Sequence, residues 1–199
     1  SRNGKIGEYK FQATGTRHKI EGLPDGRTIH WVELTNLKPG KAYYFVAGDA
    51  NNGFTEERKL QTIPDGTQKL RFVDGGDMGT GPALQPLMRQ AALQEPNFAV
   101  VGGDIAYAGD VLASFGLWDR WLDGWEQCMV TPKGFTIPMV LAIGNHEVRG
   151  GVGHSPTNAV FYFRYFAQVP DRSFYSRKFG KNFVIYLLDS GHITPPGGE

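Results

Sequence analysis

The sequence has little of several features that would define a class of protein. Its one cysteine, Cys128, excludes an internal disulfide and a zinc site built from cysteines. The 21 Lys and Arg residues nearly balance the 20 Asp and Glu residues, so no basic stripe indicates nucleic-acid binding. The longest apolar run, residues 137–144, is far too short to span a bilayer. What is left is a globular composition, with 199 residues for one medium domain or two small ones.

Residues 1–62 lack helical periodicity and are typical of short strands between turns. Polarity alternates over residues 28–37 and again over 41–49, with a Pro-Gly turn signal between them. This pattern predicts an all-β sandwich. The stretch also resembles a fibronectin type III module, in which Tyr43 would lie at the corner that leads into a late strand. Such a sandwich needs about seven strands and about 100 residues, so we expect a partial module.

After a polar segment at 63–69, which is expected to be a linker, strands and helices alternate. Short apolar strands are predicted at 70–76, 97–103 and 137–144, with helices at 83–95 and 117–128 between them. This order predicts a largely parallel sheet covered on both faces. One helical face carries three residues that are expected in the core: Trp118, Trp121 and Trp125. Residues 173–190 predict a hairpin that turns at 180–182, and its second arm is expected to join the sheet.

Polar side chains follow glycines at the carboxyl ends of the three predicted parallel strands. The ends read GGDMG (75–79), GGDIAY (102–107) and GNHE (144–147). They supply Asp77, Asp104, Tyr107, Asn145 and His146. Because ligands bind outside the carboxyl ends of strands in open parallel sheets, these groups are expected to converge. Two carboxylates and a phenol at one point would repel each other or stay protonated without a cation, so the pattern predicts a metal site.

In this order the three motifs resemble those of the calcineurin-like metallophosphoesterase superfamily. Within it, RFVDGGDMG, GGDIAYAG and AIGNHE are most similar to the purple acid phosphatases, whose second motif has a tyrosine three residues after its aspartate. Members often carry a fibronectin-like module ahead of the catalytic domain. The resemblance implies a partial module at 1–62, a linker at 63–69 and the N-terminal part of the catalytic domain at 70–199. The implied α/β fold is the N-terminal half of an αββα sandwich.

The resemblance also implies a role for each motif residue. Asp77 and Tyr107 would bind the first of two metal ions, Fe(III), and Asp104 would bridge both ions. Asn145 would bind the second, a divalent Fe, Zn or Mn ion. His146 would donate a hydrogen bond to the phosphate as negative charge builds up. The implied reaction is hydrolysis of a phosphorylated small molecule or other phosphate ester by a metal-bound hydroxide.

Two further carboxylates are expected to be structural. Asp74 also fits the Asp-x-Gly pattern, but alignment of the whole stretch RFVDGGDMG with the first motif of the family, without a gap, places Asp77 at the motif aspartate. Asp74, inside the strand, is therefore expected to be a hydrogen-bonded structural carboxylate. Glu147 is expected to support the loop after the third strand and not to touch metal.

The family pattern requires three more histidine ligands, which this sequence does not supply. His18 and His30 lie in the β part, and His154 lies in a glycine-rich loop. His192 is followed by Thr194 where a Gly-His-x-His motif would have its second histidine. We therefore expect a fragment truncated at both ends, with half a metal site, weak metal binding and little or no turnover. Secretion or export to the periplasm is implied by the family, and the oligomeric state is left open.

Alternatives remain open. The substrate could be a monoester, a diester or a nucleotide pyrophosphate. A dinucleotide-binding domain would use 75–81 as a phosphate loop, but Gly76, Gly79 and Gly81 do not form Gly-x-Gly-x-x-Gly. A third reading is a non-catalytic binding or adhesion protein with a degenerate phosphoesterase domain, which the missing histidines favour.

Overall fold

The structure, a computed structural model, describes residues 9–66, 68–168 and 172–191. In its first part it has strands and no helix among the described residues, as expected. The strands are β1 (Thr16–Lys19), β2 (Thr28–Trp31), β3 (Ala42–Phe45), β4 (Gly48–Asp49), β5 (Gly53–Phe54) and β6 (Arg58–Gln61). They form three antiparallel pairs, β1 with β2, β3 with β6 and β4 with β5.

The predicted tyrosine corner is present at Tyr43. Its hydroxyl accepts the backbone N–H of Lys38 at 2.8 Å, five residues upstream. The turn between them contains Gly40, whose φ of 62° lies in the left-handed region that glycine adopts without steric cost. This hydrogen bond back to the upstream chain is the feature that defines such corners in sandwich domains.

The second part is built on a parallel sheet, which confirms the predicted strand direction. Its strand order is β10 (Met139–Leu141), β8 (Phe98–Val101) and β7 (Phe72–Gly75). Helix α1 (Leu84–Leu93) and helix α2 (Phe115–Cys128) connect these strands. Pro86 is tolerated in α1 because it lies in the first turn, where backbone N–H groups have no acceptor within the helix.

Shorter elements complete this part. They are the 3-10 helices η2 (Leu112–Ser114), η3 (Asn145–Glu147) and η4 (Pro156–Asn158), helix α3 (Val160–Tyr165), and strands β9 (Phe135–Thr136), β11 (Tyr175–Phe179) and β12 (Phe183–Leu187). Among the residues described, no helix has the length and apolar character needed to cross a membrane.

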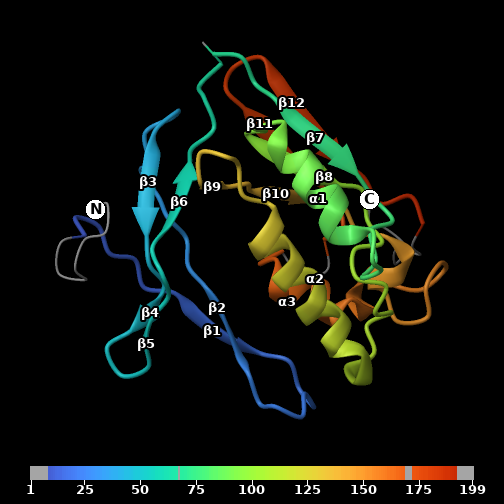
Figure 1. Cartoon of the computed structure of the whole chain (residues 1–199). Coiled ribbons are helices and arrows are strands. Elements are labelled where there is room, and N and C mark those ends of the chain that lie inside the picture. The colour runs from blue at the N-terminus through green and yellow to red at the C-terminus, as the bar shows by residue number, and fades with distance from the viewer. Residues whose placement is uncertain (1–8, 67, 169–171, 192–199) are drawn as a thin grey trace.

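The parallel sheet has a different layer on each face (Figure 1). Ala99 and Val101 of β8 join the main core, which also contains the three predicted core tryptophans of α2. Phe98 of the same strand joins a second cluster with Phe179 and Leu187 of the β11–β12 hairpin. Because successive strand side chains point to opposite faces, β8 separates a helical layer from a hairpin layer.

The expectation that the second arm of the hairpin joins the parallel sheet is wrong. Within the described chain β12 pairs only with β11, in a separate antiparallel ladder that turns where predicted. Its residues alternate in burial: Leu187 is 4% exposed and Tyr186 is 72% exposed. A central parallel strand would be buried on both faces, whereas β12 is buried on one, and an apolar run alone does not distinguish the two cases.

The first part packs firmly on the second. The guanidinium of Arg27 forms a forked ion pair with Asp119 of α2, and the indole N–H of Trp31 donates to the carbonyl of Arg164 at 2.6 Å. Strand β6 also pairs in parallel with β9, so one small sheet contains strands from both parts. In Figure 1, β1 and β2 lie on the side of the molecule that α2 and α3 face.

We expect Arg27→Ala to lower the free energy of unfolding by about 1–2 kcal/mol, because it removes a bidentate pair whose arginine side chain is 29% exposed. Urea denaturation followed by tryptophan fluorescence measures the change. Arg17→Ala is the matched control, since Arg17 is exposed on β1. Its effect should stay within about 0.5 kcal/mol. Equal effects of the two substitutions would contradict a docking role for Arg27.

Candidate functional site

The loops that follow β7 and β8 run side by side. The N–H of Asp77 donates to the carbonyl of Gly103 at 3.2 Å, and the N–H of Met78 donates to the carbonyl of Asp104 at 3.0 Å. The Tyr107 hydroxyl then donates to Oδ1 of Asp77 at 2.8 Å. Three of the predicted site residues, from two strand ends, are therefore brought together by direct contacts of their backbone or side chains.

The same three residues have unusual backbone conformations. Asp77, Asp104 and Tyr107 have φ values of 51°, 51° and 56°, in the left-handed region. A non-glycine residue in this region costs on the order of 1–3 kcal/mol, and such residues concentrate at functional sites. The rest of the fold must supply this energy, so the strain marks these loops as a candidate site independently of the side-chain chemistry.

The third strand end reaches the same point through His146. Its backbone N–H donates to Oδ1 of Asp104 at 3.0 Å, and its ring stacks on that of Tyr107 with 4.2 Å between the ring centroids. Asn145 precedes it at the start of η3 and is partly buried. Among the described residues no recorded hydrogen bond joins the Asn145 side chain to Asp77, Asp104 or Tyr107. The backbone carbonyl of Asn145 accepts the N–H of Val148 at 3.4 Å, which holds it in η3 next to His146.

Glu147 supports the loops, as predicted. Its side chain is fully buried, and Oε2 accepts the N–H groups of Asp104 and Gly144, each at 2.8 Å. Oε1 accepts the N–H of Ile105 at 2.7 Å. Burial raises the pKa of Glu147, although these N–H groups favour its charged form. One carboxylate therefore joins the loops that follow β8 and β10.

Two glycines permit the close approach of these loops. A Cβ atom on Gly103 would lie 2.7 Å from Cα of Gly144, and one on Gly144 would lie 2.3 Å from Oδ1 of Asp104. Gly103 also has a φ of 94°. Any larger residue at either position would push Asp104 away from the third strand end.

Asp74 differs from the sequence interpretation, and Asp110 was not part of it. Asp74 lies in β7, as predicted, but its side chain is exposed and no hydrogen bond to it is recorded in the described chain. Asp110 was missed, although it is 1% exposed and its Oδ1 accepts the N–H of Phe161 at 2.9 Å. Burial raises the pKa of Asp110. Its position directly after Gly109, at the end of the strand-end motif, was the available signal.

The donor set fits one side of a metal site. Carboxylate, phenol and amide oxygens suit a hard cation. The hydrogen bond to Asp77, followed by burial and by the Asp77 charge, raises the pKa of Tyr107 to about 12, so the phenol keeps its proton in the protein alone. Within residues 9–66, 68–168 and 172–191, however, no group of three or more His, Cys, Asp or Glu side chains could hold a metal ion. The described residues thus do not form a complete dinuclear site.

The other histidines lie elsewhere. The ring of His18 stacks on Trp31 with 3.6 Å between the centroids, and His30 is exposed on β2. His154 is exposed in the loop before η4. His192 lies outside the described residues. No recorded contact within the described chain joins His18, His30 or His154 to the strand-end residues.

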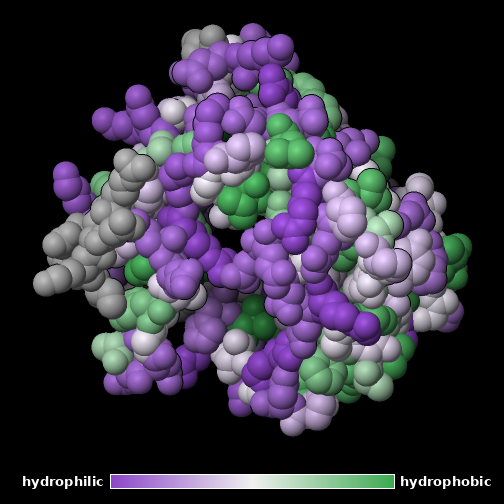
Figure 2. Space-filling view, viewed as in Figure 1, coloured by the Kyte–Doolittle hydropathy of each residue, from purple (hydrophilic) through white to green (hydrophobic). Residues whose placement is uncertain are grey.

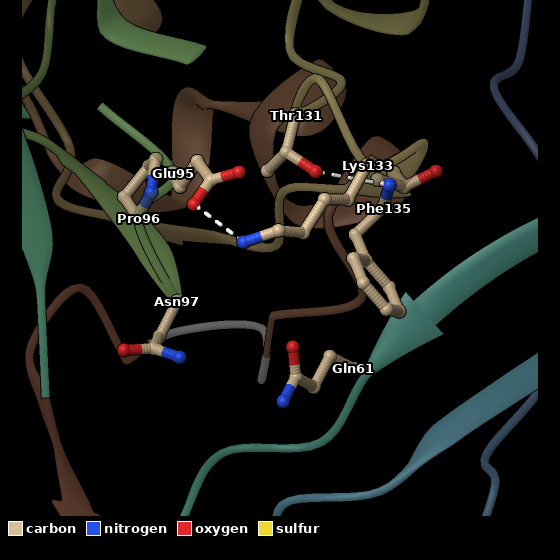
Figure 3. Close-up of a pocket in the computed structure, with 8 residues that line it drawn as sticks. Gln61, Glu95, Pro96, Asn97, Thr131, Lys133 and Phe135 are labelled. Atoms are coloured by element: carbon tan, nitrogen blue, oxygen red, sulfur yellow. Dashed lines mark hydrogen bonds and ion pairs between the residues drawn. The ribbon is translucent and has the colours of Figure 1, made fainter. Parts of the chain in front are cut away.

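Two pockets lie away from the four predicted ligands, around the junction of the first and second parts. Figure 2 shows a hollow near the middle of the molecular surface in this view, bordered by both hydrophilic and hydrophobic residues. One pocket, of about 150 Å³, lies between β6, β9 and the start of β8. In Figure 3 its lining includes Gln61, Asn97 and the ion pair of Lys133 with Glu95, which is 2.8 Å long. Neither pocket is lined by Asp77, Asp104, Tyr107 or Asn145.

Comparisons with known proteins show what the chain is similar to. Residues 3–62 match the family model described as the purple acid phosphatase N-terminal domain. An uncharacterized protein of Mycobacterium tuberculosis is 30% identical in an alignment 198 positions long, which covers 86% of this chain and 35% of that protein.

Two proteins of Arabidopsis thaliana are 24% identical to this chain. Purple acid phosphatase 13 aligns over 69% of this chain and 30% of its own length. Probable inactive purple acid phosphatase 9 aligns over 73% of this chain and 26% of its own length. The chain thus spans about a third or less of the length of these relatives. The chain is thus similar to purple acid phosphatases, and its residues 3–62 match the model of their N-terminal domain.

Proposed function

We propose that the protein containing this chain hydrolyses phosphate esters with a metal-bound hydroxide. The observation that supports this most directly is the contact of Tyr107 with Asp77 beside Asp104, at two adjacent strand ends in strained conformations. Relationship to the purple acid phosphatases suggests a phosphoesterase-type activity. The choice among monoesters, diesters and nucleotide pyrophosphates stays open, because loops determine it.

In this proposal the strand-end residues hold two metal ions. Asp77 and Tyr107 would bind Fe(III), Asp104 would bridge, and Asn145 would bind a divalent Fe, Zn or Mn ion. The ions, when bound, supply a hydroxide for attack on phosphorus. The Tyr107 hydroxyl would lose the proton that it now donates to Asp77. The His146 ring, stacked on Tyr107, would donate a hydrogen bond to a phosphate oxygen.

The domain division and the compartment belong to the same proposal. Residues 1–62 form a partial fibronectin-like module, 63–69 a linker, and 70–199 the first half of an αββα phosphoesterase domain, in a secreted or periplasmic protein. The described residues supply carboxylate, phenol and amide ligands at the strand ends but no histidine ligand. The chain by itself is therefore expected to bind metal weakly and to turn over little substrate.

A second candidate function is binding without catalysis. It is favoured by the lack, among the described residues, of any complete group of metal ligands. One plant relative also carries the words "probable inactive" in its name. Under this alternative the domain would still fold, but the full-length protein would bind no metal.

Substitutions in the full-length protein test the proposed roles. Asp104→Asn should abolish metal loading, because it removes the bridging carboxylate. His146→Ala should retain the metal and lower kcat by roughly 10²–10³-fold, as for other donors to a developing oxyanion. Elemental analysis and hydrolysis of a phosphomonoester measure the two effects.

Asp74→Asn is the matched control, since Asp74 is an exposed carboxylate on β7. It should change neither metal content nor rate. Full activity of the Asp104 variant would refute the assignment. A wild-type protein without metal or activity would favour the binding protein.

Glu147 serves the proposed site by fixing the backbone of Asp104. We expect Glu147→Gln to lower the free energy of unfolding by roughly 2–4 kcal/mol, because an amide presents one acceptor and one donor to three buried N–H groups. Urea denaturation measures the loss. Glu95→Gln, at a partly exposed ion pair, should cost less than about 1 kcal/mol. Similar losses of stability for Glu147→Gln and Glu95→Gln would show that the Glu147 hydrogen bonds stabilise the fold no more than an exposed ion pair does.

A further inference from the structure

A second cavity, of about 220 Å³, lies where the first part of the chain meets the loops after β8 and β10. Its lining includes Lys19, Glu21, Asp110, Arg149, Phe161 and Arg164. Lys19 ends β1, and Arg149 follows the GNHE motif. The cavity is therefore built jointly by the N-terminal strands and by the strand-end loops, and it includes none of the proposed metal ligands.

Three cationic side chains border this cavity. No ion pair to Lys19 or Arg164 is recorded in the part of the chain that the structure describes. Nη1 of Arg164 lies 3.5 Å from Nδ1 of His18, and its backbone carbonyl is held by the Trp31 indole at 2.6 Å. The backbone on which Arg164 sits is thus fixed while its guanidinium retains free donors.

Arg149 is oriented by the chain below it. Its Nε and Nη2 atoms donate to the backbone carbonyl of Asp110 at 3.3 and 3.2 Å, while its side chain stays 61% exposed. A guanidinium carries five N–H donors, so these contacts leave others for a ligand. Arg149 therefore presents a held but accessible cation.

The two acidic residues of the lining leave an excess of positive charge. The Asp110 side chain is 1% exposed, its Oδ1 accepts the N–H of Phe161, and its Oδ2 forms an ion pair with Nη2 of Arg149 at 3.8 Å. Asp110 therefore offsets part of the Arg149 charge while it holds that side chain in place. Glu21 is exposed and follows the buried Ile20. Three cations thus border the cavity with two carboxylates, of which Glu21 is the exposed one.

We infer that this cavity binds a phosphate group, either free phosphate or the phosphate of an ester, through Arg149, Arg164 and Lys19. Guanidinium groups match the oxygens of phosphate in a bidentate geometry, and lysine adds a point charge. The volume is below the roughly 300–1,000 Å³ of pockets for drug-sized ligands, which suits a single group. The site goes beyond the proposed catalytic function because it requires no metal.

The cavity is connected to the catalytic loops through the backbone. The N–H of Gly109 donates to the carbonyl of His146 at 2.9 Å, and the next residue, Asp110, accepts the bonds from Arg149. A phosphate held here would lie against the same loops that carry Tyr107 and His146. Its occupancy does not depend on catalysis at the strand ends.

The test is a calorimetric titration of the intact protein, freed of metal by a chelator, with inorganic phosphate at constant ionic strength. We expect one saturable site that Arg164→Gln and Lys19→Gln each weaken roughly tenfold, because each removes a charged partner. Arg177→Gln and Lys178→Gln are matched controls on the β11–β12 hairpin and should leave the affinity unchanged. Since metal is absent, failure of the metal site cannot mimic failure of this one.

A second titration, with glycerol phosphate in place of inorganic phosphate, identifies the source of the group. Tighter binding of the ester indicates a phosphoester ligand, and tighter binding of the ion indicates free phosphate; either result supports the site. Absence of saturable binding to both, or equal loss in the control variants, overturns the inference. If Arg164→Gln fails to fold, Lys19→Gln decides alone, since Lys19 is exposed at the end of β1.

Discussion

The carboxylate of Glu147 lies fully buried between two loops and accepts three backbone N–H groups from them. Those loops approach so closely at Gly103 and Gly144 that neither position has room for a Cβ atom. Asp104 is held in a left-handed conformation at this crossing, and its own carboxylate accepts the N–H of His146. The positions of Asp104 and His146 thus follow from one hydrogen-bonded buried carboxylate and two residues without side chains.

The layers around the sheet supply the energy that this arrangement requires. Three left-handed residues at the strand ends cost several kcal/mol together, by the usual magnitudes. Burial of Trp118 and Trp121 of α2 in the main core, and of Phe98 in the cluster with the hairpin, removes large apolar surfaces from water on both faces of β8. A short sheet of three strands can therefore carry strained loops at its carboxyl edge, because its strands are clamped from both sides.

Sequence reasoning succeeded where a local rule determines the outcome. The parallel strands, the helix with three tryptophans, the corner at Tyr43 and the supporting role of Glu147 all follow from periodicity, turn signals or motif position. The meeting of Asp77, Asp104 and Tyr107 follows from the rule that parallel strands end at one edge. Their roles as metal ligands are proposals, because the fold shows where these side chains lie and not what they bind.

Where the structure differs from the sequence-based predictions, the cause is a contact between residues far apart in the chain. The apolar run of β12 did not reveal which of its faces would be covered, and the partner that covers it is set by tertiary packing. Asp110 was missed because Phe161, whose N–H it accepts, lies 51 residues further along the chain. Asp74 was expected to be hydrogen-bonded because it lies in a strand, yet that strand leaves its side chain exposed.

The pairing of β6 with β9 joins the first part of the chain to the second in one small sheet. A sheet shared across the two parts means that exchange of N-terminal modules between relatives would succeed only if the β9 segment were exchanged with them, since each partner strand completes the other's ladder.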